Sequence, residues 1–177
     1  MSDQSAMAGT AAALRAAFDR TYALPSQTQQ TSKTEDLLAI RLAGAPYALR
    51  VREIAGLANH RRPVALPSGI PELLGVAGLR GELVPVYSLA ALLDGHRGTE
   101  EVRWLALCRA EDPIGLAFAD FEGYLQVPLA EIYAANHDHL AHPSVYEVTR
   151  SAGVVRSVIS IPAILEMVKR RCGKERV

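Results

Sequence analysis

An internal repeat constrains the fold of this chain more than any other feature of its 177 residues. Residues 38–56 align without a gap with residues 105–123, at a constant offset of 67. The matched positions include different residue types, among them Pro46 with Pro113, Glu53 with Asp120 and Gly56 with Gly123. Shared composition does not align prolines, glycines and acids at one offset, so the chain contains two copies of one structural unit.

A second segment repeats at an offset of 75, where Ala77-Gly78-Leu79 aligns with Ala152-Gly153-Val154. The change of offset predicts eight extra residues in the second copy, between residues 124 and 150. On this alignment Val155 takes the place of Arg80. The arginine therefore belongs to the first copy alone, which predicts a specific role for it there.

Both copies are built from short segments typical of strands, such as the alternating residues 47–52. The pattern predicts a helical turn at Pro71–Gly75, a short helix at 89–93 and a helix that begins at Pro162. Further strands are expected at residues 37–42, 83–87, 103–109, 114–119 and 154–161. Two copies of a small β unit predict two β-barrels related by a pseudo-twofold axis. We expect them to pack side by side, because each is too small to bury much surface alone.

Residues 1–36 differ from the rest and are interpreted as an N-terminal extension. It contains a short helix at Ala11–Arg20, with Leu14 and Phe18 on one face, and a polar linker near residues 26–35. That face either docks on a partner or packs on its own domain. Residues 37–177 are expected to form one domain of two barrel lobes, the second starting near residue 100, with a C-terminal helix.

Charge balance limits the classes of partner. The chain has 19 basic and 19 acidic residues, so neither non-specific nucleic-acid binding nor attraction to an anionic membrane surface is expected. No apolar run reaches the ~20 residues of a membrane span. Two cysteines, Cys108 and Cys172, do not form a disulfide framework. We therefore expect a cytoplasmic protein.

The histidines of the 137–142 segment are the candidate metal ligands. Zinc needs three or four convergent ligands, and His137, His139 and His142 meet that need only if the loop folds around the ion. A solvated loop is the simpler interpretation, so no metal and no cofactor are predicted. No nucleophile motif or phosphate-binding loop is present, so no catalytic residues are predicted. The alternative function is a β-barrel binding module for a small ligand or metal, with the 137–142 loop as its lid.

The charge that stands out is Arg80, in the turn Gly78-Leu79-Arg80-Gly81 that leads into a strand. An unpaired buried guanidinium is costly, so Arg80 needs a partner. Glu53, at the end of another strand, is the best candidate, and we predict that the two lie within salt-bridge distance. The arginine then acts as a structural tie, as a recognition residue in the groove between the barrels, or as both.

The order of several motifs resembles the CheW family of chemotaxis coupling proteins, over roughly residues 37–170. The resemblance rests on Val51-Arg52-Glu53-Ile54, Leu66-Pro67, Pro71-Glu72-Leu73-Leu74-Gly75, and Gly78-Leu79-Arg80-Gly81 running into Leu83-Val84-Pro85-Val86-Tyr87-Ser88-Leu89. It implies two SH3-like five-stranded β-barrels. It also implies a non-catalytic adaptor of a bacterial chemosensory system, which couples methyl-accepting chemoreceptors to a CheA-type histidine kinase.

The resemblance also implies site residues. Glu53 and Arg80 match an acid–arginine pair that is important for the shape and signalling of the family. Its receptor-contacting apolar surface falls on Val51, Ile54, Val76 and Leu79. The chain departs from the family at two positions, Gly78 in place of the usual Asn and Ser88 in place of the usual Asp.

Overall fold

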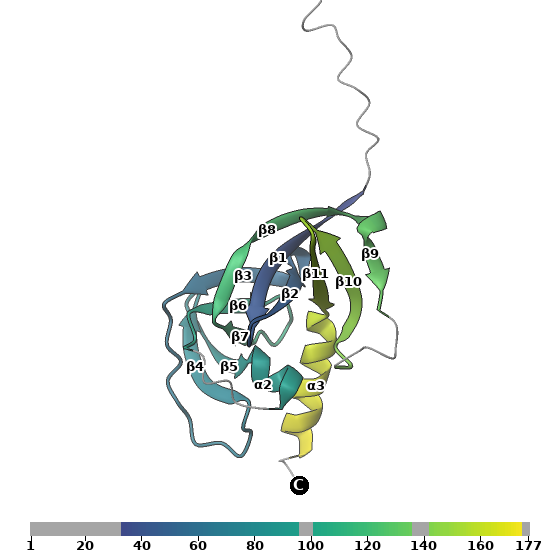
Figure 1. Cartoon of the computed structure of the whole chain (residues 1–177). Helices are drawn as coiled ribbons and strands as arrows, with labels where there is room; N and C mark the ends of the chain where they lie inside the picture. The colour runs from purple at the N-terminus through teal and green to yellow at the C-terminus, as the bar shows by residue number, and fades with distance from the viewer. Residues whose placement is uncertain (1–32, 96–100, 136–141, 175–177) are drawn as a thin grey trace, which may run out of the picture. The chain divides into compact units, whose positions relative to one another are not determined.

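The computed structural model describes residues 33–95, 101–135 and 142–174, and Figure 1 traces their path. Their strands form two sheets. The first is six-stranded, in the order β8 (Asp120–Pro128), β1 (Thr34–Leu42), β2 (Ala45–Arg50), β11 (Val154–Ile159), β10 (Val145–Ser151) and β9 (Ile132–Ala134). The second is five-stranded, in the order β3 (Ile54–Asn59), β6 (Trp104–Cys108), β7 (Gly115–Phe118), β5 (Glu82–Ser88) and β4 (Leu73–Leu79).

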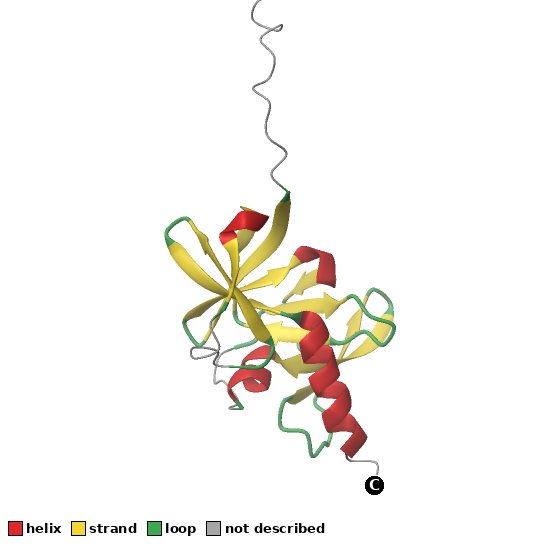
Figure 2. Cartoon of the chain, turned by 90° about the vertical axis from the view of Figure 1, so that its right-hand side faces the viewer, coloured by secondary structure: helices red, strands yellow, loops and turns green. Residues whose placement is uncertain are grey.

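Helices in the described residues are few and short, as the colouring of Figure 2 shows. They are the α-helices α2 (Leu89–Asp94) and α3 (Ile161–Lys174) and the 3₁₀ turns η1 (Val51–Glu53) and η2 (Leu129–Glu131). The predicted mainly-β class and the C-terminal helix are both present. The helix expected at Ala11–Arg20 lies outside the described residues.

Each sheet contains strands from both copies of the repeat. Strands β1 and β2 of the first copy join β8–β11 of the second, and β6 and β7 of the second join β3–β5 of the first. Two parallel contacts make the exchange: β11 pairs with β2, and β5 pairs with β7. A lobe boundary near residue 100 is therefore wrong for these sheets, because the copies interleave along the chain.

The strand registers correct part of the sequence alignment. In the hairpin β4–β5, Leu79 pairs with Glu82, and in β10–β11, Ser151 pairs with Val154, which places the two hairpins 72 residues apart. The irregularity between Leu73 and Gly75 recurs between Val145 and Glu147 at the same spacing. The offset of 75 is therefore wrong, and the second copy gains five residues rather than eight. The counterpart of Arg80 is Ala152, not Val155.

The same offset holds where each hairpin leads into a helix. The Ser88 hydroxyl accepts a hydrogen bond from the Ala91 N–H at 3.2 Å, and the Ser160 hydroxyl accepts one from the Ala163 N–H at 3.4 Å. Both serines cap the N-terminus of a helix, α2 in the first copy and α3 in the second. The largest core lies between the sheets and these helices, and its fully buried members include Leu49, Leu89, Leu116, Ile159 and Ile164.

The predicted helical turn at Pro71–Gly75 is wrong, because β4 already begins at Leu73. The segment before it pairs with the strand through Val64 and Val76, which exchange two backbone hydrogen bonds of 2.7 and 2.9 Å. Gly75 has a φ of +136°, and a Cβ there would lie 1.9 Å from the Val64 carbonyl oxygen. This glycine therefore allows a close strand approach instead of ending a helix.

Candidate functional site

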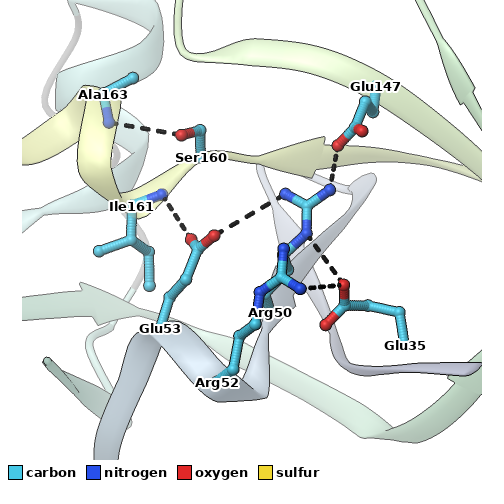
Figure 3. Close-up of polar contacts among 8 residues, drawn as sticks. All are labelled: Glu35, Arg50, Arg52, Glu53, Glu147, Ser160, Ile161 and Ala163. Carbon is cyan, nitrogen blue, oxygen red and sulfur yellow. Dashed lines mark hydrogen bonds and ion pairs between the residues drawn. The ribbon is translucent and has the colours of Figure 1, made fainter.

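Five charged side chains meet where β1, β2, η1, β10 and α3 converge (Figure 3). Arg50, the last residue of β2, lies at the centre of this charge cluster. Its Nε is 3.5 Å from Oε2 of Glu35, its Nη1 is 3.9 Å from Oε1 of Glu53, and its Nη2 contacts Glu147. Arg52 adds a second contact to Glu35, at 2.9 Å. Two guanidinium groups thus face three carboxylates.

The burial of its central side chains indicates that the charge cluster has a structural role. The Arg50 and Glu35 side chains are only 10% and 8% exposed, whereas that of Arg52 is 66% exposed. Charges taken out of water are tolerated when they are paired and hydrogen-bonded. The centre of the cluster therefore holds β1, β2 and β10 together, and Arg52 adds a solvent-exposed contact at its edge.

Glu53 extends the charge cluster to the C-terminal helix. Its Oε2 accepts a hydrogen bond from the Ile161 N–H at 3.0 Å, at the positively polarised N-terminus of α3. Burial raises the pKa of Glu53 above its ordinary value, although the Ile161 hydrogen bond, Arg50 and Arg52 all act to lower it. Burial and the Glu53 charge together raise the pKa of the Cys108 thiol to about 12, so this cysteine remains protonated and unreactive.

Arg80 lies elsewhere, and its predicted salt bridge with Glu53 is not formed. Among the described residues, the only ion pair of Glu53 is with Arg50. Arg80 occupies the β4–β5 turn with a φ of 52°, and its guanidinium lies against Gly56 of β3. The prediction is wrong because Arg50, three residues before Glu53 in sequence, lies closer to the Glu53 carboxylate and forms the ion pair.

A family comparison decides what this architecture is. The model of the CheW-like domain matches residues 36–169. The chain belongs to the CheW-like domain family. That match spans both sheets and most of α3, so the whole described fold is the CheW-like domain.

Individual relatives agree with this assignment. The chain is 24% identical over 110 residues to the chemotaxis protein CheW of Bacillus subtilis (strain 168), covering 61% of this chain and 70% of the relative. The crystal structure of the scaffolding protein TtCheW from Thermoanaerobacter tengcongensis superposes with a TM-score of 0.64 at 15% identity. That match covers 72% of this chain and 89% of TtCheW. The predicted fold of two SH3-like β-barrels is confirmed. No helix among the described residues is long and apolar enough to span a bilayer.

The four predicted partner-binding residues of this CheW-like domain divide into two pairs. Val51 and Val76 are half-buried and accessible at the surface. Ile54 and Leu79 are only 7% and 6% exposed and pack into two different cores. Partner contact stays a prediction for all four residues, of which Val51 and Val76 are accessible in the free chain and Ile54 and Leu79 are largely covered.

The histidine loop offers little for a metal in the described part of the chain. His137 and His139 lie outside the described residues. His142 is described, and its Nδ1 accepts a hydrogen bond from the Ser144 N–H at 3.1 Å. Burial first and the Arg171 charge second lower the pKa of His142. Among the described residues, no three histidine, cysteine or acidic side chains come together as a metal site.

Sequence reasoning missed the centre of the charge cluster. In the alternation of residues 47–52 Arg50 falls on the polar positions with Arg52, so the pattern predicts an exposed side chain, whereas the structure buries Ala48, Leu49 and Arg50 in succession. Its partner Glu147 lies 97 residues away in the chain, on β10, which β11 separates from β2 in an order that depends on the interleaving of the copies. The partner could not be chosen without that topology.

Proposed function

We propose that this CheW-like chain is a non-catalytic adaptor of a bacterial chemosensory system that couples methyl-accepting chemoreceptors to a CheA-type histidine kinase in the cytoplasm. The observation that carries the proposal is the family match over residues 36–169, which takes in both sheets. The relatives named CheW are a chemotaxis protein and a scaffolding protein.

The surface supports a binding role. Large apolar side chains are exposed on both sheets, whereas monomeric proteins keep contiguous exposed apolar surface small. On the five-stranded sheet and its 60–72 connection they are Leu57, Val64, Leu66 and Leu83. On the six-stranded sheet they are Tyr124, Tyr133, Tyr146 and Val155. An adaptor needs two separate contact surfaces, and exposed apolar side chains on both sheets are compatible with that requirement.

The charge cluster supports a structural rather than a catalytic role for its carboxylates. Glu53 is engaged by Arg50 and by the Ile161 N–H, and Glu35 is engaged by both Arg50 and Arg52. A general acid or base needs to reach a substrate proton. These groups face one another across the strands instead.

Reconstitution tests the proposal. The chain is mixed with a CheA-type kinase and with vesicles that display a chemoreceptor signalling domain, both from the same cell, and the vesicles are then pelleted. We expect the kinase to pellet, and its receptor-dependent autophosphorylation to rise, only when the chain is present. A folded chain that leaves both the pelleted kinase and its activity unchanged would overturn the proposal.

A further inference from the structure

The two outer strands of the five-stranded sheet, β3 and β4, face each other across an open seam. Among the described strands, β3 pairs only with β6, and β4 pairs along its length only with β5, apart from the Val64–Val76 bridge near its beginning. Between them lies a cavity of about 120 Å³. It is lined by Gly56, Leu57 and Ala58 of β3, by Gly78, Leu79 and Arg80 of the β4 hairpin, and by Arg61, Leu105 and Leu107.

The floor of the seam is apolar. Leu79, Leu105 and Leu107 belong to the core of the five-stranded sheet and are almost fully buried. Of the apolar side chains that line the cavity, Leu57 is the most accessible one, at 37% exposed. A dry apolar cavity of about 150 Å³ holds a molecule the size of benzene, so the seam has room for one aliphatic side chain.

The rim of the seam carries two guanidinium groups that no acid among the described residues pairs with. Arg61 and Arg80 both line the cavity, and neither forms an ion pair with any described residue. Their neighbours differ: Arg62 pairs with Glu101 at 3.2 Å, and Arg103 pairs with Asp120 at 4.0 Å. Two free guanidinium groups beside an apolar slot favour an occupant that is acidic as well as aliphatic.

Backbone geometry fixes the position of Arg80. Its φ of 52° belongs to the left-handed region, which non-glycine residues seldom adopt outside tight turns. Its guanidinium lies over Gly56, where a Cβ would come within 3.1 Å of both Nε and Nη2. The glycine therefore provides the space that keeps this charge at the mouth of the seam.

We propose that the seam is a binding site for a partner segment that presents an aliphatic side chain next to a carboxylate. The aliphatic group fills the space above Leu79 and Leu105, and the carboxylate is held by Arg80 and Arg61. The site goes beyond the adaptor role, because its chemistry is independent of which protein supplies the segment.

Short peptides test the site without a kinase or a receptor. The first probe is a five-residue peptide with a central leucine flanked by glutamates. The two controls replace the glutamates by glutamines or the leucine by alanine. Binding is followed by NMR through the backbone amides of Gly56 and Gly78. We expect saturable shifts at both glycines with the first peptide, and affinity at least tenfold lower for each control.

Variants locate the site. Arg80→Ala is expected to fold, because Ala152 occupies the equivalent turn position with a φ of 51°. It should weaken peptide binding about tenfold, whereas Arg62→Ala, which removes a cation already paired, should not. Gly78 has open space at its Cβ position, so Gly78→Glu can place a carboxylate at the seam and abolish binding, with Gly78→Gln as its control.

Several results would overturn the proposal. Equal binding of the glutamine peptide would exclude recognition by the two arginines. Equal binding to Arg80→Ala, or shifts confined to amides far from the seam, would place any site elsewhere. Failure of the leucine–glutamate peptide to bind would also overturn the proposal, but it would leave the adaptor proposal intact, because the vesicle assay uses whole partners and other surfaces.

Discussion

The hairpins β4–β5 and β10–β11 share one backbone plan and differ in what they turn toward the interior. Their registers, bulges, glycine-containing turns and serine caps coincide at a shift of 72 residues. Yet the equivalents of Ala77 and Val84 in the first copy are Thr149 and Arg156 in the second. All four are buried, so the second hairpin buries polar groups at two positions where the first buries apolar ones.

Buried polar groups recur across the six-stranded sheet, beside an apolar cluster of Leu37, Ala48, Val127 and Val158. Arg50 occupies the position equivalent to Ala117 of the five-stranded sheet, and Glu147 occupies the position equivalent to Gly75. Duplication therefore preserved strand pairing while polarity diverged. The five-stranded sheet has an apolar interior, with two arginines at its seam that form no ion pair with a described residue, and the six-stranded sheet contains buried ion pairs. Stability and recognition then depend on different sheets.

The largest expected effect comes from removing the central buried cation. Arg50→Met leaves Glu35, Glu53 and Glu147 without it, and breaking a buried ion pair from one side costs about 3–5 kcal/mol. Urea unfolding followed by circular dichroism measures the free energy of unfolding. The matched control is Arg52→Met, whose exposed side chain contributes about 0–1 kcal/mol. Equal losses in both variants would show that Arg50 is not the centre of the cluster.

The second comparison replaces a buried ion pair of the six-stranded sheet by the apolar residue found at the equivalent position of the five-stranded sheet. Glu122→Ala leaves Arg156 buried without the carboxylate that it contacts at 2.9 Å, which should cost about 1–3 kcal/mol. Adding Arg156→Val, which restores the residue type of Val84, should recover most of that loss. Unfolding of the two single variants and the double variant completes a double-mutant cycle. A double variant less stable than either single variant would contradict the comparison.

The turn residues explain why the sequence alignment of the copies was only partly correct. Residue identity matched Ala77-Gly78 with Ala152-Gly153, whereas the backbone matches Arg80-Gly81 with that pair. Their φ values are 52° and 85° in the first turn and 51° and 77° in the second. Two-residue hairpins of this kind demand positive φ at both positions, and residue identity conveys that only indirectly.

The mainly-β class and most strands followed from the sequence because strand periodicity is a local signal, and the family followed from the resemblance of its ordered motifs. The ion-pair partner of Glu53 did not follow from the sequence. In the structure η1 places the Glu53 carboxylate beside Arg50, whereas the Arg80 guanidinium lies against Gly56. Burial of Ile54 and Leu79 was missed for a similar reason. Which face of a strand is covered depends on how the two sheets pack.

Two carboxylates allow a comparison by pH. Burial raises the pKa of Glu53, so its contribution to stability is fully present below its ordinary value of 4.5 and is lost as the pH rises through the raised pKa. Hydrogen bonds from Arg156 first and Arg41 second lower the pKa of Glu122. Its contribution is present above 4.5 and is lost as the pH falls through the lowered pKa.

Unfolding free energies measured from pH 3 to 7 check these signs. Wild type should lose stability relative to Glu53→Gln as the pH rises above about 4.5, because the glutamine mimics the protonated acid. It should gain stability relative to Glu122→Gln as the pH rises toward 4.5. Parallel profiles for the two variants would mean that both acids experience the same environment.

The smallest effect is expected at Asp120, which stands 67 residues after Glu53 at the equivalent position in the second copy. Its side chain is 53% exposed, and it meets Arg103, itself 59% exposed, at 4.0 Å. Exposed ion pairs contribute about 0–1 kcal/mol. Asp120→Ala should therefore change the free energy of unfolding by no more than about 0.5 kcal/mol. Glu53→Ala should cost clearly more at pH 7, because it removes the acceptor for the Ile161 N–H and a partner of Arg50. Equal costs would mean that the tie between η1 and α3 contributes no more to stability than a surface ion pair.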